Sequence, residues 1–354
     1  MKVTVTKYLN VRVGKPSLNA PCYQYLAPGS EIEVDGKLYK GDKEDGAYEG
    51  INTWFKDEAG NYYWSGGFDN ANLKNQLLTG ISEKWWLKKF NIPEIWSKGI
   101  TGKGIRIAVL DTGISYPHID LNLEPKLFND VTKSASGIND IDGHGTHCTG
   151  IIKAMNNDSG AIGLAYNSMI YVCKITHDTQ GDKNEYLIQG LKWAIAQGVD
   201  IISISKGDPF GDKNLELAIN EADSKGILVI ASAGNLVPGY PSDHIYYPAR
   251  YKTTISVGGI DEKDNPLKDS LLTNETDIYA PGNEILSTYK NNDFVTLSGS
   301  SQAAPFIAGV CALILEHQRI KDPSLNAKKI KEIILKHAIS LSFGKKVNLD
   351  TIFN

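Results

Sequence analysis

The chain has 354 residues, of which 41% are hydrophobic and 22% charged, and its formal net charge is -4. Such a composition is typical of a globular protein with a large core, and the length suits two domains. The small negative charge argues against a strongly electrostatic nucleic-acid or membrane partner. The sequence contains no run of about 18 apolar residues, so it offers no candidate for a segment that spans a bilayer.

The N-terminal residues and the cysteines bear on location. Residues 1–14 alternate polar and apolar side chains and lack the unbroken apolar core of a signal peptide. The four cysteines are scattered and lie mostly in apolar surroundings, which favours buried thiols over a disulfide framework. They are Cys22, Cys148, Cys173 and Cys311. We therefore expect a cytoplasmic protein, and secretion is the alternative if a leader has been removed.

Residues 1–68 predict a small all-β domain. Short alternating or aromatic runs are separated by Gly, Pro, Asn and Asp, which is the punctuation of strands and turns. The stretch resembles a bacterial SH3-like domain at residues 9–12 (Leu-Asn-Val-Arg), 28–29 (Pro-Gly) and 63–66 (Tyr-Trp-Ser-Gly). The resemblance implies a β-barrel that binds a peptide or glycan ligand. A spacer or docking domain packed on a second domain is the alternative.

Residues 69–84 are polar and predict a linker, and residues 85–354 predict an α/β domain. Two segments with helical periodicity, 184–198 and 214–226, end at a glycine, which is the usual stop signal of a helix. Apolar runs suited to buried parallel strands lie at 105–111, 169–175, 199–205, 227–235 and 253–259. Strands that alternate with helices predict a parallel sheet covered by helices on both faces.

Three segments carry residues suited to nucleophilic catalysis. Asp111 ends an apolar strand, His144 opens an apolar helical run, and Ser301 begins a long apolar helix. Alone, each has an ordinary explanation, because aspartate often caps turns and serine often caps helices. Together they supply a hydroxyl nucleophile, an imidazole that takes and returns its proton, and a carboxylate that orients the imidazole. The combination predicts a peptidase with the chain order Asp, His, Ser.

These three segments, together with Ala-Ser-Ala-Gly-Asn at 231–235 and Ile-Tyr-Ala-Pro-Gly at 278–282, resemble the subtilase family. The resemblance extends from about Trp85 to the C-terminus. It implies a three-layer peptidase domain with a parallel sheet, and a serine endopeptidase that cleaves proteins or peptides through an acyl-enzyme without a cofactor. It also implies that the side-chain amide of Asn235 stabilises the tetrahedral intermediate.

Two kinds of metal site come into question. His144 and His147, with Cys148 and Asp142 nearby, would suit zinc in a metallohydrolase, but a second ligand pair at suitable spacing and an HExxH motif are missing from the sequence. The resemblance implies instead a structural calcium site, for which oxygen ligands are appropriate. Its ligands would be the side chains of Asp120 and Asn157 and the backbone carbonyls of Met155, Ser159 and Ala161. Ile81 stands where the family has a glutamine ligand, so a calcium-free loop is the alternative.

The resemblance also implies two walls of a substrate groove, formed by Ser205, Lys206 and Gly207 and by Ser232, Ala233 and Gly234. Lys206 replaces an apolar residue of the family. It predicts either pairing with an acidic substrate side chain or a lysine that extends to solvent. Tyr246 stands where a glycine often floors the specificity pocket, which predicts poor cleavage after large aromatic residues. A binding protein with a dormant peptidase domain is the non-enzymatic alternative.

Overall fold

The computed structural model describes residues 2–6, 9–17, 20–35, 39–40, 53–64, 84–157 and 160–353. The chain divides into two compact units, Met1–Glu83 and Lys84–Asn354. The predicted linker, residues 69–84, lies outside the described residues except for Lys84, so its bounds remain a prediction. Among the described residues, no helix combines the length and apolar character that a bilayer crossing requires.

The N-terminal unit is built from short antiparallel strands, as its alternating sequence predicts. Strand β1 (Lys2–Thr4) pairs with β4 (Glu31–Glu33). A five-stranded sheet has the order β3-β2-β7-β6-β5, with bounds Cys22–Leu26, Leu9–Val13, Asn61–Trp64, Thr53–Lys56 and Tyr39–Lys40. Trp54 and Phe55 are fully buried in its core. The unit is therefore all-β in its described part, while its likeness to an SH3 domain remains a prediction.

The second unit is organised around a nine-stranded sheet with the order β19-β20-β16-β15-β14-β13-β8-β10-β9. All neighbouring pairs are parallel except β19 and β20 at one edge. In that order the strands are Ile339–Leu341, Gly344–Lys346, Ile278–Pro281, Ile255–Ile260, Leu228–Ser232, Ile201–Ile204, Arg106–Asp111, Met169–Lys174 and Phe128–Asp130. The five apolar runs identified in the sequence are thus confirmed as neighbouring strands of this sheet.

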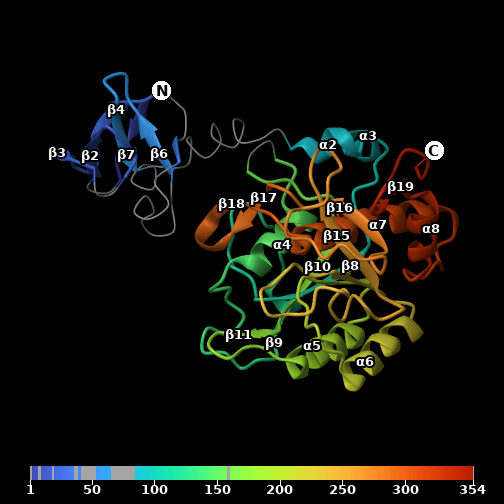
Figure 1. Cartoon of the computed structure of the whole chain (residues 1–354). Helices are drawn as coiled ribbons and strands as arrows, with labels where there is room; N and C mark the ends of the chain where they lie inside the picture. The colour runs from blue at the N-terminus through green and yellow to red at the C-terminus, as the bar shows by residue number, and fades with distance from the viewer. Residues whose placement is uncertain are drawn as a thin grey trace. The chain divides into compact units, whose positions relative to one another are not determined.

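Helices cover both faces of the sheet (Figure 1), which confirms the α/β prediction. On one face lie α2 (Trp85–Lys89), α3 (Ile92–Ser97), α4 (His144–Lys153), α7 (Ser300–Lys321) and α8 (Lys329–His337). On the other lie α5 (Asn184–Ala196) and α6 (Lys213–Ser224). Because side chains alternate along a strand, Ile107 and Val109 of β8 pack in the first core while Ala108 and Leu110 pack in the second.

The remaining described elements are short. They are β11 (Thr176–His177), β12 (Gly181–Asp182), β17 (Ile285–Tyr289), β18 (Asp293–Leu297), and the 3-10 helices η2 (Pro125–Leu127) and η3 (Lys290–Asn292). Strands β11 and β12 form an antiparallel hairpin that follows β10 in the chain. This hairpin therefore rises from the carboxyl edge of the sheet, where the parallel strands end.

Phe306 tests how strongly the core depends on α7. Its side chain is 1% exposed and packs edge-on against Trp86 and Phe90, with ring centroids 5.6 Å apart in both pairs. Truncating a buried phenylalanine costs about 3–5 kcal/mol because it leaves a cavity. We expect Phe306→Ala to lower the melting temperature by roughly 10 °C in calorimetry. Ile320→Ala, on the same helix but 71% exposed, should change it little, and equal losses in the two variants would contradict this packing.

Candidate active site

The three residues predicted for catalysis lie where the sequence analysis places them in the fold. Asp111 is the last residue of β8, His144 is the first residue of α4, and Ser301 is the second residue of α7. Strand β8 is an interior strand between β13 and β10, and both helices pack on the same face of the sheet. Parallel strands present their carboxyl ends at one edge, which is the usual place of a site in such folds.

Asp111 and His144 form a short, shielded pair. Asp111 Oδ1 lies 2.7 Å from His144 Nδ1 and also accepts a hydrogen bond from the Thr112 backbone amide at 2.8 Å. The Asp111 side chain is fully buried, whereas that of His144 is 21% exposed. The carboxylate thus fixes the orientation of the imidazole, while the imidazole retains access to solvent.

The two groups stabilise each other's charge. Burial alone would lower the pKa of His144, but the adjacent Asp111 carboxylate raises it well above its usual range. Burial would likewise raise the pKa of Asp111, but His144, through its charge and its hydrogen bond, holds it below the usual value. A carboxylate next to an imidazole is the arrangement that makes histidine an effective proton acceptor.

Ser301 lies beside the end of β13. Its hydroxyl donates to the backbone carbonyl of Ser205 at 3.2 Å, and the Ser205 hydroxyl donates to the Ser301 carbonyl at 2.8 Å. Cys148 lies one turn along α4 from His144 and contacts both His144 and Ser301. Its Sγ atom is 3.8 Å from His144 Nδ1 and 3.5 Å from the Ser301 carbonyl oxygen. The Ser301 hydroxyl therefore has to exchange the Ser205 carbonyl for the imidazole before it can pass its proton to His144.

Asn235, the predicted oxyanion residue, is oriented by Ser300. The Ser300 amide and hydroxyl both donate to Asn235 Oδ1, at 3.2 and 3.1 Å. The carbonyl side of the carboxamide is thereby occupied, so its Nδ2 group is the one left to face a substrate oxygen. This role of Ser300 was not predicted from the sequence, although Ser300 directly precedes the predicted nucleophile Ser301.

Asp140 joins the loop after β8 to the start of α4 and was also missed. Its buried carboxylate accepts hydrogen bonds from Thr112 Oγ1 (2.8 Å), from the Gly143 amide (2.8 Å), and from the Thr146 amide and hydroxyl (2.8 and 2.7 Å). These contacts fix the helix that carries His144 against the strand that carries Asp111. An aspartate shortly before a helix start is a recognisable signal for such a role.

His147 does not share a site with His144. Its Nε2 lies 3.0 Å from the Ile285 carbonyl of β17 and 3.1 Å from the Val295 carbonyl of β18. Burial lowers its pKa to about 4, so the ring is neutral and donates to these carbonyls. His147 is therefore a structural residue, and the zinc alternative loses one of its two histidines.

The predicted groove residues surround Tyr246. Its backbone amide donates to the Ala233 carbonyl at 2.9 Å, and its side chain is 4% exposed. A Cβ atom at Gly234 would lie 2.7 Å from Tyr246 Cδ2, and one at Gly207 would lie 3.0 Å from Tyr246 Cβ. The tyrosine thus packs against both predicted walls, 232–234 and 205–207, and both glycines are needed to admit it.

The predicted calcium residues come together, but with nitrogen donors facing Asp120. Asn157 Nδ2 donates to Asp120 Oδ1 and the Ala161 amide donates to Oδ2, both at 2.9 Å. The Met155 amide donates to the Asp120 carbonyl at 3.0 Å. Ser159 and Ile81 lie outside the described residues. In this arrangement Asn157 presents its amide nitrogen to Asp120, so the set offers a calcium ion one side-chain oxygen fewer than the sequence predicts.

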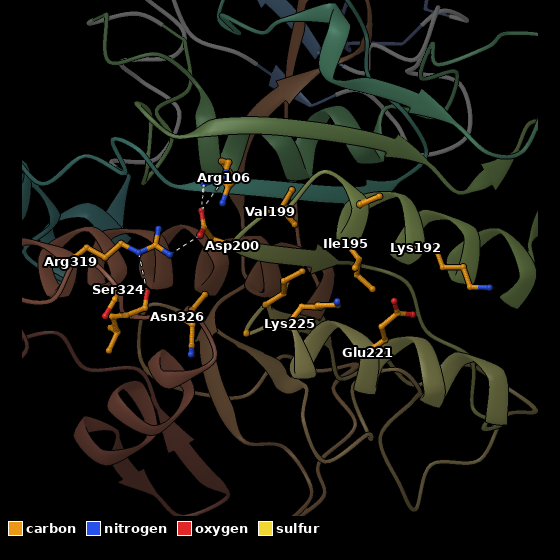
Figure 2. Close-up of a pocket in the computed structure, with 16 residues that line it drawn as sticks. Arg106, Lys192, Ile195, Val199, Asp200, Glu221, Lys225, Arg319, Ser324 and Asn326 are labelled. Carbon is orange, nitrogen blue, oxygen red and sulfur yellow. Dashed lines mark hydrogen bonds and ion pairs between the residues drawn. The ribbon is translucent and has the colours of Figure 1, made fainter.

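A cavity of about 630 Å³ lies at the opposite end of β8 (Figure 2). Asp200, which directly precedes β13, accepts from the Arg106 amide at 2.9 Å and pairs with Arg319 at 2.7 Å. Arg106 is the first residue of β8 and Asp111 the last, so this cavity is separated from the catalytic edge by the length of the strand. Its ion pairs tie α7 to the sheet.

Comparison with known proteins identifies the class. The chain matches the subtilase family model over residues 102–352 and belongs to this family. It is 35% identical to Subtilisin Savinase of Lederbergia lenta over 260 residues, which cover 73% of this chain and 93% of that protein. It is 33% identical to Subtilisin DY of Bacillus licheniformis over 248 residues, 70% of this chain and 88% of that protein.

An alkaline protease of Alkalihalobacillus alcalophilus is 36% identical over 260 residues, which cover 73% of this chain and 66% of that protein. In each of these three comparisons, the matched part of this chain includes most of the second unit. The chain is therefore a subtilisin-like serine endopeptidase, a hydrolase whose family acts on protein or peptide substrates without a cofactor for the chemistry.

Ser300→Ala tests whether this serine orients Asn235. The variant loses the hydrogen bond of the Ser300 hydroxyl to Asn235 but keeps that of the backbone amide. The lost bond contributes about 1 kcal/mol to holding the Asn235 carboxamide in its orientation. We expect kcat to fall roughly 3- to 10-fold with KM nearly unchanged, as measured on a chromogenic peptide. Ser298→Ala, two residues away, serves as control and should keep its kcat, because the Ser298 hydroxyl accepts from the Glu284 amide and does not contact Asn235 among the described hydrogen bonds. Equal kcat values for Ser300→Ala and wild type would contradict the orienting role.

Proposed function

We propose that this endopeptidase uses Ser301 as nucleophile, His144 as general base and acid, and Asp111 as the residue that orients His144. The observation that carries the proposal is the 2.7 Å contact between a fully buried Asp111 and a partly exposed His144 at the start of α4. Cys148 of the same helix contacts both His144 and Ser301. A buried carboxylate that holds one imidazole nitrogen leaves the other free for proton transfer.

The proposed reaction has two balanced steps. Ser301 Oγ bonds to the substrate carbonyl carbon while its proton passes to His144 Nε2; the peptide C–N bond then breaks and the same proton passes to the leaving amine. In the second step His144 takes a proton from water, whose oxygen bonds to the acyl carbon; the bond between that carbon and Ser301 Oγ then breaks, the acid product leaves, and His144 returns the proton to Ser301 Oγ. His144 carries the proton in both steps.

The oxyanion formed in each step would be stabilised by two donors. Asn235 supplies its Nδ2 group, whose direction follows from the bonds of Ser300 to Oδ1. The backbone amide of Ser301, in the first turn of α7, supplies the second. Both donors stand in place before the reaction, which is the condition for strong stabilisation of a developing charge.

Two substitutions test the mechanism. Ser301→Ala should abolish hydrolysis and fluorophosphonate labelling without changing the circular dichroism spectrum. Asn235→Ala should lose roughly two to three decades of kcat with little change in KM, the size found when an oxyanion-hole donor of subtilisin is removed. Turnover by Ser301→Ala at the wild-type rate would contradict the proposal. An inactive wild type with an intact fold would favour the binding-protein alternative.

We also propose a narrow pocket for the substrate residue before the cleaved bond. Tyr246 occupies the space between Gly207 and Gly234, and its hydroxyl is buried without a hydrogen-bond partner among the described residues. A large aromatic substrate side chain would have to displace the phenol, which typically costs about 1–3 kcal/mol. Small side chains would therefore be favoured at this position.

Calcium binding to the loop that contains Asp120 and Asn157 stays a proposal, and it requires Asn157 to turn its carbonyl oxygen inward. Burial raises the pKa of Asp120 to about 7. Without a cation, ionisation of this carboxylate therefore lowers the free energy of unfolding. A folded-state pKa above the unfolded one means that the stability present at acidic pH is lost as the pH rises through 7.

Thermal unfolding at pH 5 and pH 8 with a chelator tests this account. The melting temperature of wild type should fall more between these pH values than that of Asp120→Asn, which cannot ionise there. If calcium binds, adding it at pH 8 should raise the wild-type value by several degrees and leave the variant unchanged. Wild type and variant with the same pH dependence would contradict the buried charge. A wild type that does not respond to calcium would refute the calcium site.

We propose that the N-terminal unit serves in targeting, docking or regulation and binds a peptide or glycan ligand. Its described part contains an aromatic cluster at the margin of its core, in which Tyr62 is buried and Tyr39 packs against it. The rings of Tyr39 and Tyr62 meet edge-on with centroids 5.6 Å apart, and Lys56 Nζ lies 5.3 Å from the centre of the Tyr62 ring.

A further inference from the structure

Lys206 is paired within the protein at the catalytic edge. It lies two residues beyond β13 and directly follows Ser205, whose carbonyl accepts the Ser301 hydroxyl. Its Nζ atom lies 3.3 Å from Oδ2 of Asp182. The lysine side chain is only 24% exposed, whereas that of Asp182 is 55% exposed. The ammonium is therefore held at the protein surface rather than extended into solvent.

The ion pair reaches across the strand that carries Asp111. Strands β13, β8 and β10 are consecutive in the sheet, with β8 in the middle. Lys206 follows β13, whereas Asp182 belongs to the β11–β12 hairpin that follows β10. A bond between them must cross the carboxyl end of β8, where Asp111 lies. The ion pair thus connects the segments that follow β13 and β10, the two strands on either side of β8 and Asp111.

The charges around Lys206 are mainly negative. Burial would lower its pKa, but Asp111, Asp182 and Asp142 together hold it above the usual value.

Several elements place titratable groups close enough to interact electrostatically with His144. They are Asp111 of β8, Cys148 and His147 of α4, and Tyr289 of β17. Asp142, from the segment before α4, accepts the His144 amide at 3.1 Å. The positive charge of Lys206 acts on Asp111, the carboxylate that holds His144, and helps to lower its pKa. A second cation, Lys290, donates to the Ile141 carbonyl at 2.8 Å, beside Asp142.

This distribution disfavours the pairing of Lys206 with a substrate carboxylate. An acidic substrate side chain would have to replace Asp182 while approaching Asp111 and Asp142, and like charges at short range repel. Because the Lys206 ammonium is already paired with Asp182, it attracts an incoming carboxylate only weakly.

We propose that Lys206 is a positioning residue, an internal counter-ion that fastens the β11–β12 hairpin across the catalytic edge and opposes the negative charge of Asp111 at His144. This inference rests on the proposed function of His144 as general base. A neighbouring cation disfavours the imidazolium form, so Lys206 keeps His144 neutral, and thus able to accept a proton, to lower pH.

The sign of the effect differs between the two members of the ion pair. Removing the positive charge in Lys206→Met should move the acidic limb of kcat/KM to higher pH, because the imidazolium is then less repelled. Removing the negative charge in Asp182→Asn should move it to lower pH. Each shift should be about half a pH unit, as expected for one unit charge several ångströms away in a water-like dielectric, and should shrink in 1 M salt.

The experiment measures kcat/KM against pH for wild type, both variants and Lys206→Arg, which keeps the charge and should keep the acidic limb in place. Lys183→Met is the matched control, because it removes an exposed lysine next to Asp182 in the chain and should leave the limb unmoved. Peptides with Asp or Ala near the cleaved bond should be affected alike by Lys206→Met.

Two results would overturn the inference. One is an acidic limb that stays in place in both variants. The other is a selective loss of cleavage of the Asp-containing peptides in Lys206→Met, which would make Lys206 a substrate ligand. The His144 pKa is also measured by NMR in the inactive Ser301→Ala background. There the same opposite shifts should appear even if Ser301 is not the nucleophile, which separates this inference from the proposed function.

Discussion

The site depends on one constraint: a charged carboxylate is kept in a fully buried position at the end of β8. Burial of Asp111 is unfavourable unless its charge is compensated, and the imidazole of His144 at 2.7 Å provides that compensation. The remaining geometry serves to hold these two groups together. Asp140 ties the loop after β8 to the start of α4, and the parallel sheet brings the end of β13, with Ser205, next to Ser301.

The same edge of the sheet combines rigid and adjustable parts. Ser300 fixes the carboxamide of Asn235 by two hydrogen bonds, whereas the Ser301 hydroxyl bonds to a carbonyl that it must leave before reaction. The proposed oxyanion donor Asn235 is thus preorganised, whereas the proposed nucleophile Ser301 has to change its hydrogen-bond partner. This division agrees with the view that fixed dipoles contribute most to stabilising a transition state.

Much of the fold and the positions of the proposed catalytic residues could be predicted from the sequence because they depend on local pattern. Apolar runs fixed the central strands, and Gly198 and Gly226, both with positive φ, end the helices as expected. The roles of Ser300 and Asp182 could not be predicted, because their partners Asn235 and Lys206 are far away in the chain. Asp140 could have been recognised from its position shortly before a helix start, although its contact with Thr112 spans 28 residues. For Asp120 and Asn157, residue type suggested oxygen ligands, but the loop conformation turns the amide nitrogen of Asn157 toward Asp120.

The central claim is that Ser301 carries the acyl group, and mapping the site of covalent modification tests it most directly. The full chain would be treated with a fluorophosphonate, digested, and sequenced by tandem mass spectrometry. The account predicts one adduct, on Ser301 and not on the adjacent Ser300, formed in proportion to the loss of activity. An adduct on another residue, or complete inactivation with Ser301 unmodified, would contradict it.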